Sequence, residues 1–200
     1  AIGAVSITAG GEGTGVLYPL LLAATGIISS ILGTFFVRVK EGGDPALALR
    51  LGLGSTGLFM LIGTFFLTRW MFEGDLTLFY AVLSGVVAGL LIGAATEYYT
   101  SGDYSSVKEI AAASETGAAT NILAGLGVGM KSTALPVILV CCSIIAGVFF
   151  GGLYGIACAA VGMLAITGMA LSVDAYGPIA DNAGGIAEMS ELPDEIREIT

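Results

Sequence analysis

Residues 174–189 read Asp-Ala-Tyr-Gly-Pro-Ile-Ala-Asp-Asn-Ala-Gly-Gly-Ile-Ala-Glu-Met and directly follow a run of 42 residues, 132–173, without Asp, Glu, Lys or Arg. Seven residues is close to two helical turns, so a helix here would place Asp174, Asp181 and Glu188 on one face, about 10 Å apart. Carboxylates next to an apolar span are costly unless they meet cations. The pattern therefore favours a divalent metal, a metal-bound phosphate or an ion path.

Composition defines the class of protein. The chain is 56% hydrophobic and 12% charged, whereas soluble domains are about 25% charged. Several uncharged stretches reach the roughly 20 residues that are needed to cross a bilayer. We predict an all-α integral membrane protein of about five transmembrane helices plus a partial one near residues 1–11. The expected spans are 15–38, 48–70, 76–99, 116–148 and 153–182, with a cytoplasmic tail at 183–200.

Two sequence features support this division. The long uncharged run carries Gly151 and Gly152, which predict a break between two helices. Gly85, Gly89 and Gly93, like Gly147, Gly151 and Gly155, recur at every fourth residue, which predicts a smooth strip on each of two helices. Packing of neighbouring helices is the simpler explanation of the strips, and room for a helix shift is the functional alternative.

Basic residues predict the orientation. If the first span ends at Arg38, five basic residues fall on one side and only Arg69 on the other, which makes the first side cytoplasmic; the five are Arg38, Lys40, Arg50, Lys108 and Arg197. Asp181 and Glu188 are then expected at the cytoplasmic mouth of the last span.

The chemistry of this composition is limited. Histidine is absent, so zinc sites that contain histidine are excluded, and Cys141, Cys142 and Cys158 are read as small side chains facing lipid or core. Only a hard cation on oxygen ligands remains as a metal site. Residues 125–133 resemble a phosphate-binding loop, but Met130 stands where that motif needs glycine, so we reject it.

Several polar residues have a structural reading beside the functional one. Lys131 either extends to the membrane boundary or neutralises an acid inside the bundle. Asp174 is either hydrogen-bonded to a neighbouring helix or part of an ion path. Asp181 is either a helix N-cap before a turn at Gly184 and Gly185 or a metal ligand. The sequence does not decide between a structural and a functional role for Glu97. The segment from Thr100 to Glu115 is expected to be a loop. A solvated helix should start after Pro193.

Three blocks in this order resemble the membrane-bound, ion-pumping inorganic pyrophosphatases. They are Thr96-Glu-Tyr-Tyr-Thr-Ser101, Glu115-Thr-Gly-Ala-Ala-Thr-Asn121 with Gly129-Met-Lys-Ser132, and the stretch from Asp174 to Met189. Residues 1–95 match only in hydropathy and at Val37-Arg38-Val39. The resemblance implies a homodimer of 16-helix bundles, of which this chain would supply the end of the sixth helix and helices seven to eleven.

The resemblance also implies a site. Pyrophosphate would be hydrolysed with Mg²⁺ on the cytoplasmic side, coupled to transport of H⁺ or Na⁺, and a K⁺ requirement stays open. Asp181 matches an aspartate that holds magnesium pyrophosphate, with Asn182 as support on the substrate side. Asp174, Glu188, Lys131 and Glu97 are assigned to the polar network or ion path.

Other family blocks do not match any part of these 200 residues. The catalytic set is therefore incomplete, and we expect this chain alone, read as an internal piece of a longer protein, to be inactive. The implied partners are pyrophosphate, the bilayer, the remaining helices and a second copy, with no nucleic acid. The membrane would be a prokaryotic plasma membrane or that of an acidic organelle. The alternative is a segment of a secondary transporter or channel whose acids conduct ions without hydrolysis.

Overall fold

A computed structural model describes residues 13–39, 43 and 45–197. This part of the chain is helical and contains no strand, which confirms the all-α prediction. The expected partial helix at residues 1–11 and the basic residue Lys40 lie outside the described residues. The helices are α2 (Gly13–Thr34), α3 (Pro45–Met71), α4 (Thr77–Thr100), α5 (Ser105–Ser114), α6 (Ala118–Ser132), α7 (Ala134–Leu164), α8 (Thr167–Met189) and α9 (Asp194–Arg197).

Four helical segments are long and apolar enough to cross a membrane. They are Gly13–Thr34, Pro45–Met71, Thr77–Ser114 and Ala118–Met189. The fourth, at 72 residues, is far longer than one crossing needs. It does not run straight, and the number of crossings therefore depends on where it reverses.

The reversal lies inside α7, at the two glycines that the sequence singled out. Gly151 and Gly152 leave the helical conformation, and Gly152 has φ +57°, a left-handed conformation that glycine adopts without steric cost. A Cβ on Gly155 would lie 2.1 Å from the carbonyl oxygen of Gly147. The two halves of α7 therefore fold back on each other, as the predicted break requires.

Only one of the two predicted glycine strips lies on a single helix and packs against a neighbouring one. Gly85 and Gly89 of α4 face Ala159 and Met163 in the second half of α7, and a Cβ on Gly85 would lie 1.9 Å from the Ala159 carbonyl oxygen. The α4 strip therefore packs a neighbouring helix, as expected. The prediction of one strip through Gly147 and Gly155 was wrong, because the break puts these residues on two helices that pack against each other.

The core lies where α2, α3, α4 and the second half of α7 meet. It consists of Tyr18, Leu22, Met60, Val82, Val86, Tyr154 and Cys158. Its two tyrosine hydroxyls are paired: that of Tyr18 lies 2.7 Å from the Thr68 hydroxyl, and that of Tyr154 donates to the Gly15 carbonyl oxygen at 2.7 Å. These bonds join α2 to α3 and to α7, so few polar atoms of the core lack partners.

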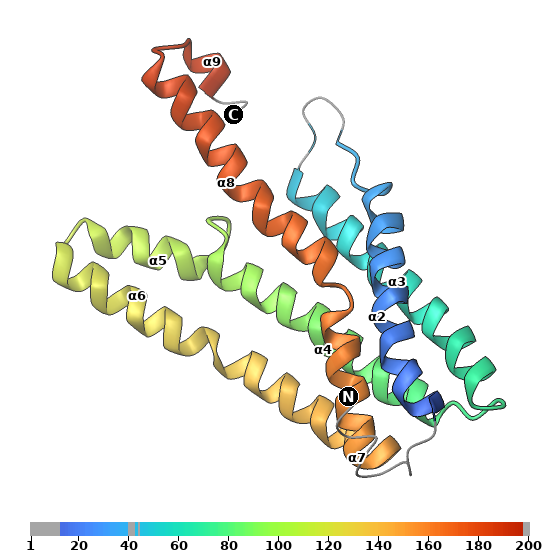
Figure 1. Cartoon of the computed structure of the whole chain (residues 1–200). Coiled ribbons are helices and arrows are strands. Elements are labelled where there is room, and N and C mark those ends of the chain that lie inside the picture. The colour runs from blue at the N-terminus through green and yellow to red at the C-terminus, as the bar shows by residue number, and fades with distance from the viewer. Residues whose placement is uncertain (1–12, 40–42, 44, 198–200) are drawn as a thin grey trace.

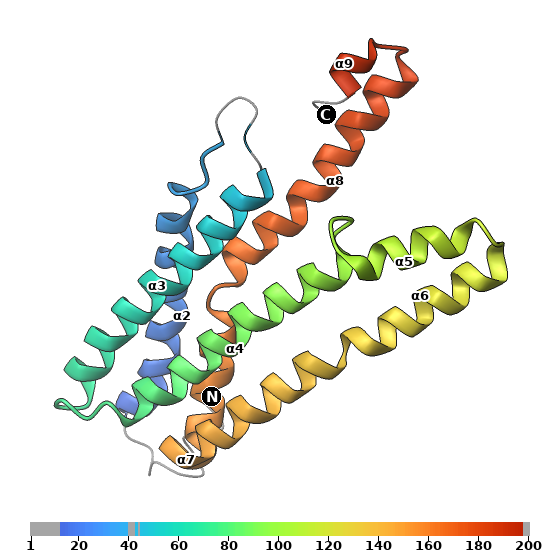
Figure 2. The same cartoon turned by 180° about the vertical axis from the view of Figure 1, so that it is seen from behind.

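Two parts of the chain extend beyond this core. Figure 1 shows the C-terminal half of α8 and the hairpin of α5 and α6 extending away from the end at which the α3–α4 turn lies, and Figure 2 shows the same from behind. Residues 100–115 are not the expected loop, because Ser105–Ser114 form α5. The short helix α9 begins after Pro193, as predicted.

Candidate functional site on α8 and the neighbouring helix ends

The three carboxylates of the signature stretch lie on one continuous helix. Asp174, Asp181 and Glu188 all belong to α8, which runs through Pro178 to Met189. Their spacing of seven residues places them on one face, about 10 Å apart along the axis. The alternative reading of Asp181 as an N-cap before a turn at Gly184 and Gly185 was wrong, since these residues lie inside the helix.

This face of α8 is open. Asp174, Asp181, Asn182 and Glu188 are all exposed. Within residues 13–39, 43 and 45–197, the side chains of Asp174, Asp181 and Asn182 form no hydrogen bond or ion pair with another residue. The exposed oxygens of Asp181 are therefore available to a ligand.

The metal-binding capacity of α8 is limited by this geometry. Carboxylates about 10 Å apart cannot bind one ion together, and the described residues hold no cluster of three potential ligands. Mg²⁺ is commonly bound by one or two carboxylates, with substrate phosphates and water completing the shell. Asp181 fits the role of one such ligand, and further ligands must come from substrate or from other helices.

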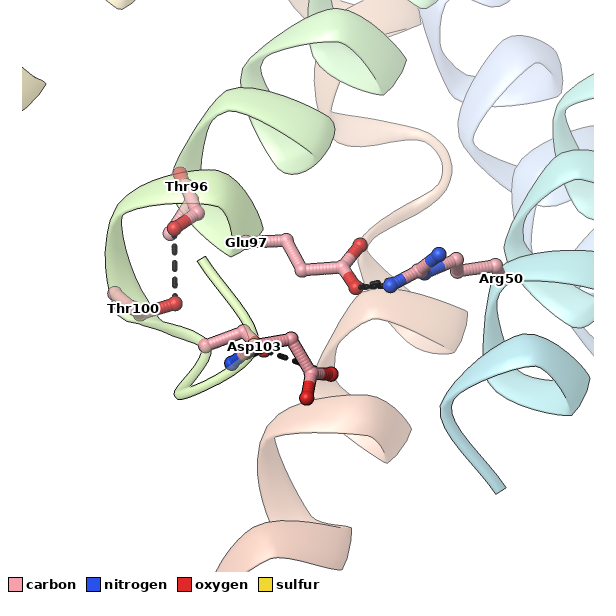
Figure 3. A network of polar contacts seen from close by, with 6 residues as sticks. Arg50, Thr96, Glu97, Thr100 and Asp103 are labelled. Atoms are coloured by element: carbon pink, nitrogen blue, oxygen red, sulfur yellow. Dashed lines mark hydrogen bonds and ion pairs between the residues drawn. The ribbon is translucent and has the colours of Figure 1, made fainter. Parts of the chain in front are cut away.

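Glu97 has a partner that the sequence did not reveal. The Arg50 guanidinium of α3 forms an ion pair with the Glu97 carboxylate of α4, and its Nε donates to Oε1 at 2.6 Å. Figure 3 shows the two side chains meeting between the helices, with Thr96, Thr100 and Asp103 on the α4 side. The partners are 47 residues apart, so only the packing of α3 on α4 brings them together.

Lys131 lies in the last turn of α6 and is exposed. Residues 125–132 are helical, which agrees with the rejection of a phosphate-binding loop there. Of the assigned polar network, the structure joins Glu97 to Arg50, places Lys131 on α6 and places Asp174 and Glu188 on α8. Their assignment to one network stays a prediction.

A separate groove of about 620 Å³ runs between α2, α7 and α8. Its walls are mostly apolar, and the hydroxyl of Ser30 is buried there without a hydrogen-bond partner. The groove holds none of the predicted site residues. It is therefore separate from the candidate site on α8.

The family model for the inorganic H⁺ pyrophosphatases matches residues 1–200, the whole chain. The chain belongs to this family. As a member of the inorganic H⁺ pyrophosphatase family with several long apolar helices, it is an integral, multi-pass membrane segment.

Individual relatives of this pyrophosphatase chain agree with the family match. It is 50% identical over 194 residues to a putative K⁺-stimulated pyrophosphate-energized sodium pump of Clostridium tetani. It is 44% identical over 193 residues to a K⁺-insensitive pyrophosphate-energized proton pump of Methanosarcina mazei. These matches cover 93% and 92% of the chain, and the chain spans 29% of the length of each relative.

Proposed function

We propose that this chain is part of a membrane ion pump that hydrolyses inorganic pyrophosphate with Mg²⁺ on the cytoplasmic side and couples hydrolysis to transport of H⁺ or Na⁺. The observation that carries the proposal is the match over the whole chain to a pyrophosphatase family, together with relatives named as pyrophosphate-energized pumps. These names favour the pump over a secondary transporter or channel segment.

Asp181 is the residue to which we assign the substrate. It is exposed on a helix that extends beyond the core, so a charged ligand can reach it from water. Its carboxylate would hold Mg²⁺ bound to pyrophosphate, and the adjacent Asn182 amide would support the substrate. A bound Mg²⁺ supplies neutralisation of the pyrophosphate oxygens, which lowers the barrier to attack by water.

The remaining polar residues belong to the coupling part of the proposal. Asp174 lies two helical turns before Asp181 on the same face, toward the apolar core. A carboxylate at that position can hold a proton or a cation as α8 shifts. Glu188, Lys131 and Glu97 would complete the polar network, Glu97 through its ion pair with Arg50.

Relatives differ in the effect of K⁺, since one is named as K⁺-stimulated and another as K⁺-insensitive. Dependence on K⁺ is therefore proposed as a variable property of the longer protein and not assigned to a residue here. Catalysis needs groups beyond α8, so we expect the 200-residue chain alone to release no phosphate. The working unit is proposed to be a homodimer.

The test is phosphate release by the longer protein in lipid with magnesium pyrophosphate. We expect Asp181→Asn to lower the rate by about 100-fold or more, the scale on which loss of one electrostatic contact to the reacting group acts. Glu109→Gln, which removes an exposed acid of α5, is the matched control and should keep the wild-type rate. Equal rates for Asp181→Asn and the control would exclude the assigned role.

A further inference from the structure

A buried hydroxyl on α2 lacks a partner and lies beside the start of α8. The Ser30 side chain is 8% exposed, and its hydroxyl has no hydrogen-bond partner among the residues that the structure describes. The hydroxyl of the neighbouring Ser29, in contrast, donates to the Thr25 carbonyl oxygen of the same helix at 2.7 Å. A buried hydroxyl without a partner costs free energy. The orientation of Ser30 therefore needs an explanation that Ser29 does not.

The break between α7 and α8 leaves groups of the opposite kind. The helix α8 begins at Thr167, and its series of backbone bonds starts at the Ile166 carbonyl oxygen, which accepts from the Met169 N–H at 3.1 Å. The first amides of a helix have no acceptor within that helix. The Ile166 side chain, at the N-cap position, makes no capping bond. The amides of Thr167 and Gly168 therefore need an acceptor from outside α8.

Ser30 lies where such an acceptor is needed. A Cβ on Gly168 would lie 2.9 Å from the Ser30 Oγ. The Cα–Cβ and N–H bonds of a helix both tilt toward its N-terminus, so the hydroxyl is on the side to which the Gly168 amide points. A hydroxyl oxygen and an amide in the first helical turn are the pair that forms an ordinary N-cap bond. Here the two groups are adjacent and complementary, and they belong to different helices.

The start of α8 is also its anchor. One turn earlier on the same face of α2, Gly26 packs against the junction, since a Cβ there would lie 2.5 Å from the Ala165 carbonyl oxygen. The Met169 side chain reaches Gly52 of α3. Of the residues of α8, all of which the structure describes, Met169 and Ala187 are the buried ones. The direction of α8 therefore depends on contacts in its first turn.

We propose that Ser30 is a positioning residue that caps α8 in the longer protein, its hydroxyl oxygen accepting the Gly168 N–H. The structure shows the uncapped position, and a small shift of α8 makes the bond. Asp181 lies 13 residues beyond Gly168, about 20 Å along the helix, so a tilt of about 3° at the cap moves its carboxylate by about 1 Å. Only this effect on Asp181 rests on the proposed function; the cap itself does not.

The competing explanation is a partner for Ser30 from another helix of the longer protein. The Ser30 oxygen is enclosed by the described residues. A group from outside reaches it only if α2 and α8 move apart. The two explanations therefore differ in whether the Ser30 hydroxyl holds α8 in place.

Two spin labels on the longer protein in lipid vesicles measure the position of α8. Cysteines carry the labels at Phe36, which follows α2, and at Met189, the last residue of α8, because both sites are exposed. The exposed Cys141 and Cys142 are replaced by serine, as are reactive cysteines outside these 200 residues. The distribution of distances between the labels then reports how firmly α8 is held against α2.

We expect Ser30→Ala to widen this distribution, because the first turn of α8 loses its cap. Ser30→Thr keeps the hydroxyl, and its added methyl group has room in the groove that Ser30 lines, so the wild-type distribution should return. Ser29→Ala is the matched control, since it removes a buried hydroxyl that bonds within its own helix, and it should match the wild type. Equal distributions for Ser30→Ala and the wild type would overturn the cap.

Phosphate release from magnesium pyrophosphate tests the positioning role. We expect kcat to fall about 10-fold in Ser30→Ala, the scale on which loss of a cap shifts an equilibrium, with a smaller change in KM. Ser30→Thr should restore kcat, and Ser29→Ala should leave it unchanged. A widened distribution with wild-type kcat would overturn the positioning role. If the longer protein released no phosphate at all, the proposed function would fail, and the label distances would still decide the cap.

Discussion

The ion pair between Arg50 and Glu97 joins the N-terminal end of α3 to the C-terminal end of α4. Both side chains are partly exposed, at 44% and 32%, so solvent screens their attraction. Exposed pairs of this kind contribute about 0.2–1 kcal/mol. The pair therefore sets geometry between two helices more than it adds stability.

A double-mutant cycle isolates this pair. Arg50→Gln and Glu97→Gln, singly and together, should show a coupling of about 0.2–1 kcal/mol in the free energy of unfolding, measured in detergent. The cycle is needed because Arg50 has a further interaction in the structure. Additive single effects would mean that the pair adds nothing to stability.

Asp75 gives the α3–α4 turn a dependence on pH. Its carboxylate accepts hydrogen bonds from the Thr77 backbone N–H, at 2.8 Å, and from the Thr77 hydroxyl. The hydroxyl and then the backbone bond lower the pKa of Asp75 below its ordinary 3.8. Because the folded-state pKa is lowered, the stabilisation is complete above pH 3.8 and is lost as pH falls through the folded value.

Thr77→Ala tests the Asp75 contact, because it removes the hydroxyl and leaves the backbone donor. We expect the pKa of Asp75, followed by NMR of its labelled carboxyl carbon, to rise toward 3.8 in this variant. An unchanged titration would mean that the hydroxyl does not hold the carboxylate.

Among the helices, α4 and α7 approach each other so closely that their contact requires glycine at Gly85. Gly85 lies against the Ala159 backbone so closely that a methyl group has no room. Gly85→Ala should lower stability by about 1–3 kcal/mol, since one helix must move away from the other. Gly127→Ala is the matched control, because nothing lies near the Cβ position of Gly127 on α6.

Thermal unfolding in detergent, followed by circular dichroism, compares the two glycine variants. We expect a lower melting temperature for Gly85→Ala and an unchanged or higher one for Gly127→Ala, where alanine favours the helix. A Gly85→Ala protein as stable as the wild type would show that α4 and α7 are not in close contact at this point.

Features of the helices that follow from residues near one another in the sequence were predicted correctly. The helical spacing of Asp174 and Asp181 and the glycine break at Gly151 and Gly152 are local, and both are present. The helix α5 was missed because its ten residues have mixed charge and no long apolar run. The Arg50 partner of Glu97 was missed because no local pattern links residues that meet only through packing of two helices.

The site was predicted less completely than the fold. Spacing alone placed Asp174, Asp181 and Glu188 on one face of α8. Which groups surround a bound ligand depends on helices that pack against that face, and among the described residues none covers Asp181. For that reason the roles of Asn182, Glu188 and Lys131 stay predictions.

At the scale of the whole molecule, the chain combines a packed apolar core with parts that extend beyond it. The core buries Tyr18, Met60 and Tyr154, whereas α8 carries the acids of the family signature away from it. This division suits a pump, since a ligand binds where water reaches and the ion crosses where the helices pack. In the proposed function, pyrophosphate is the energy source for this transport.

The most direct measurement of that claim is ion uptake into sealed vesicles that contain the longer protein, started by adding magnesium pyrophosphate outside. We expect uptake of H⁺ or Na⁺ that begins when pyrophosphate is added, stops when it is consumed and is absent in Asp181→Asn. Ion flux of equal size without pyrophosphate, or unchanged pyrophosphate-driven uptake in Asp181→Asn, would contradict it.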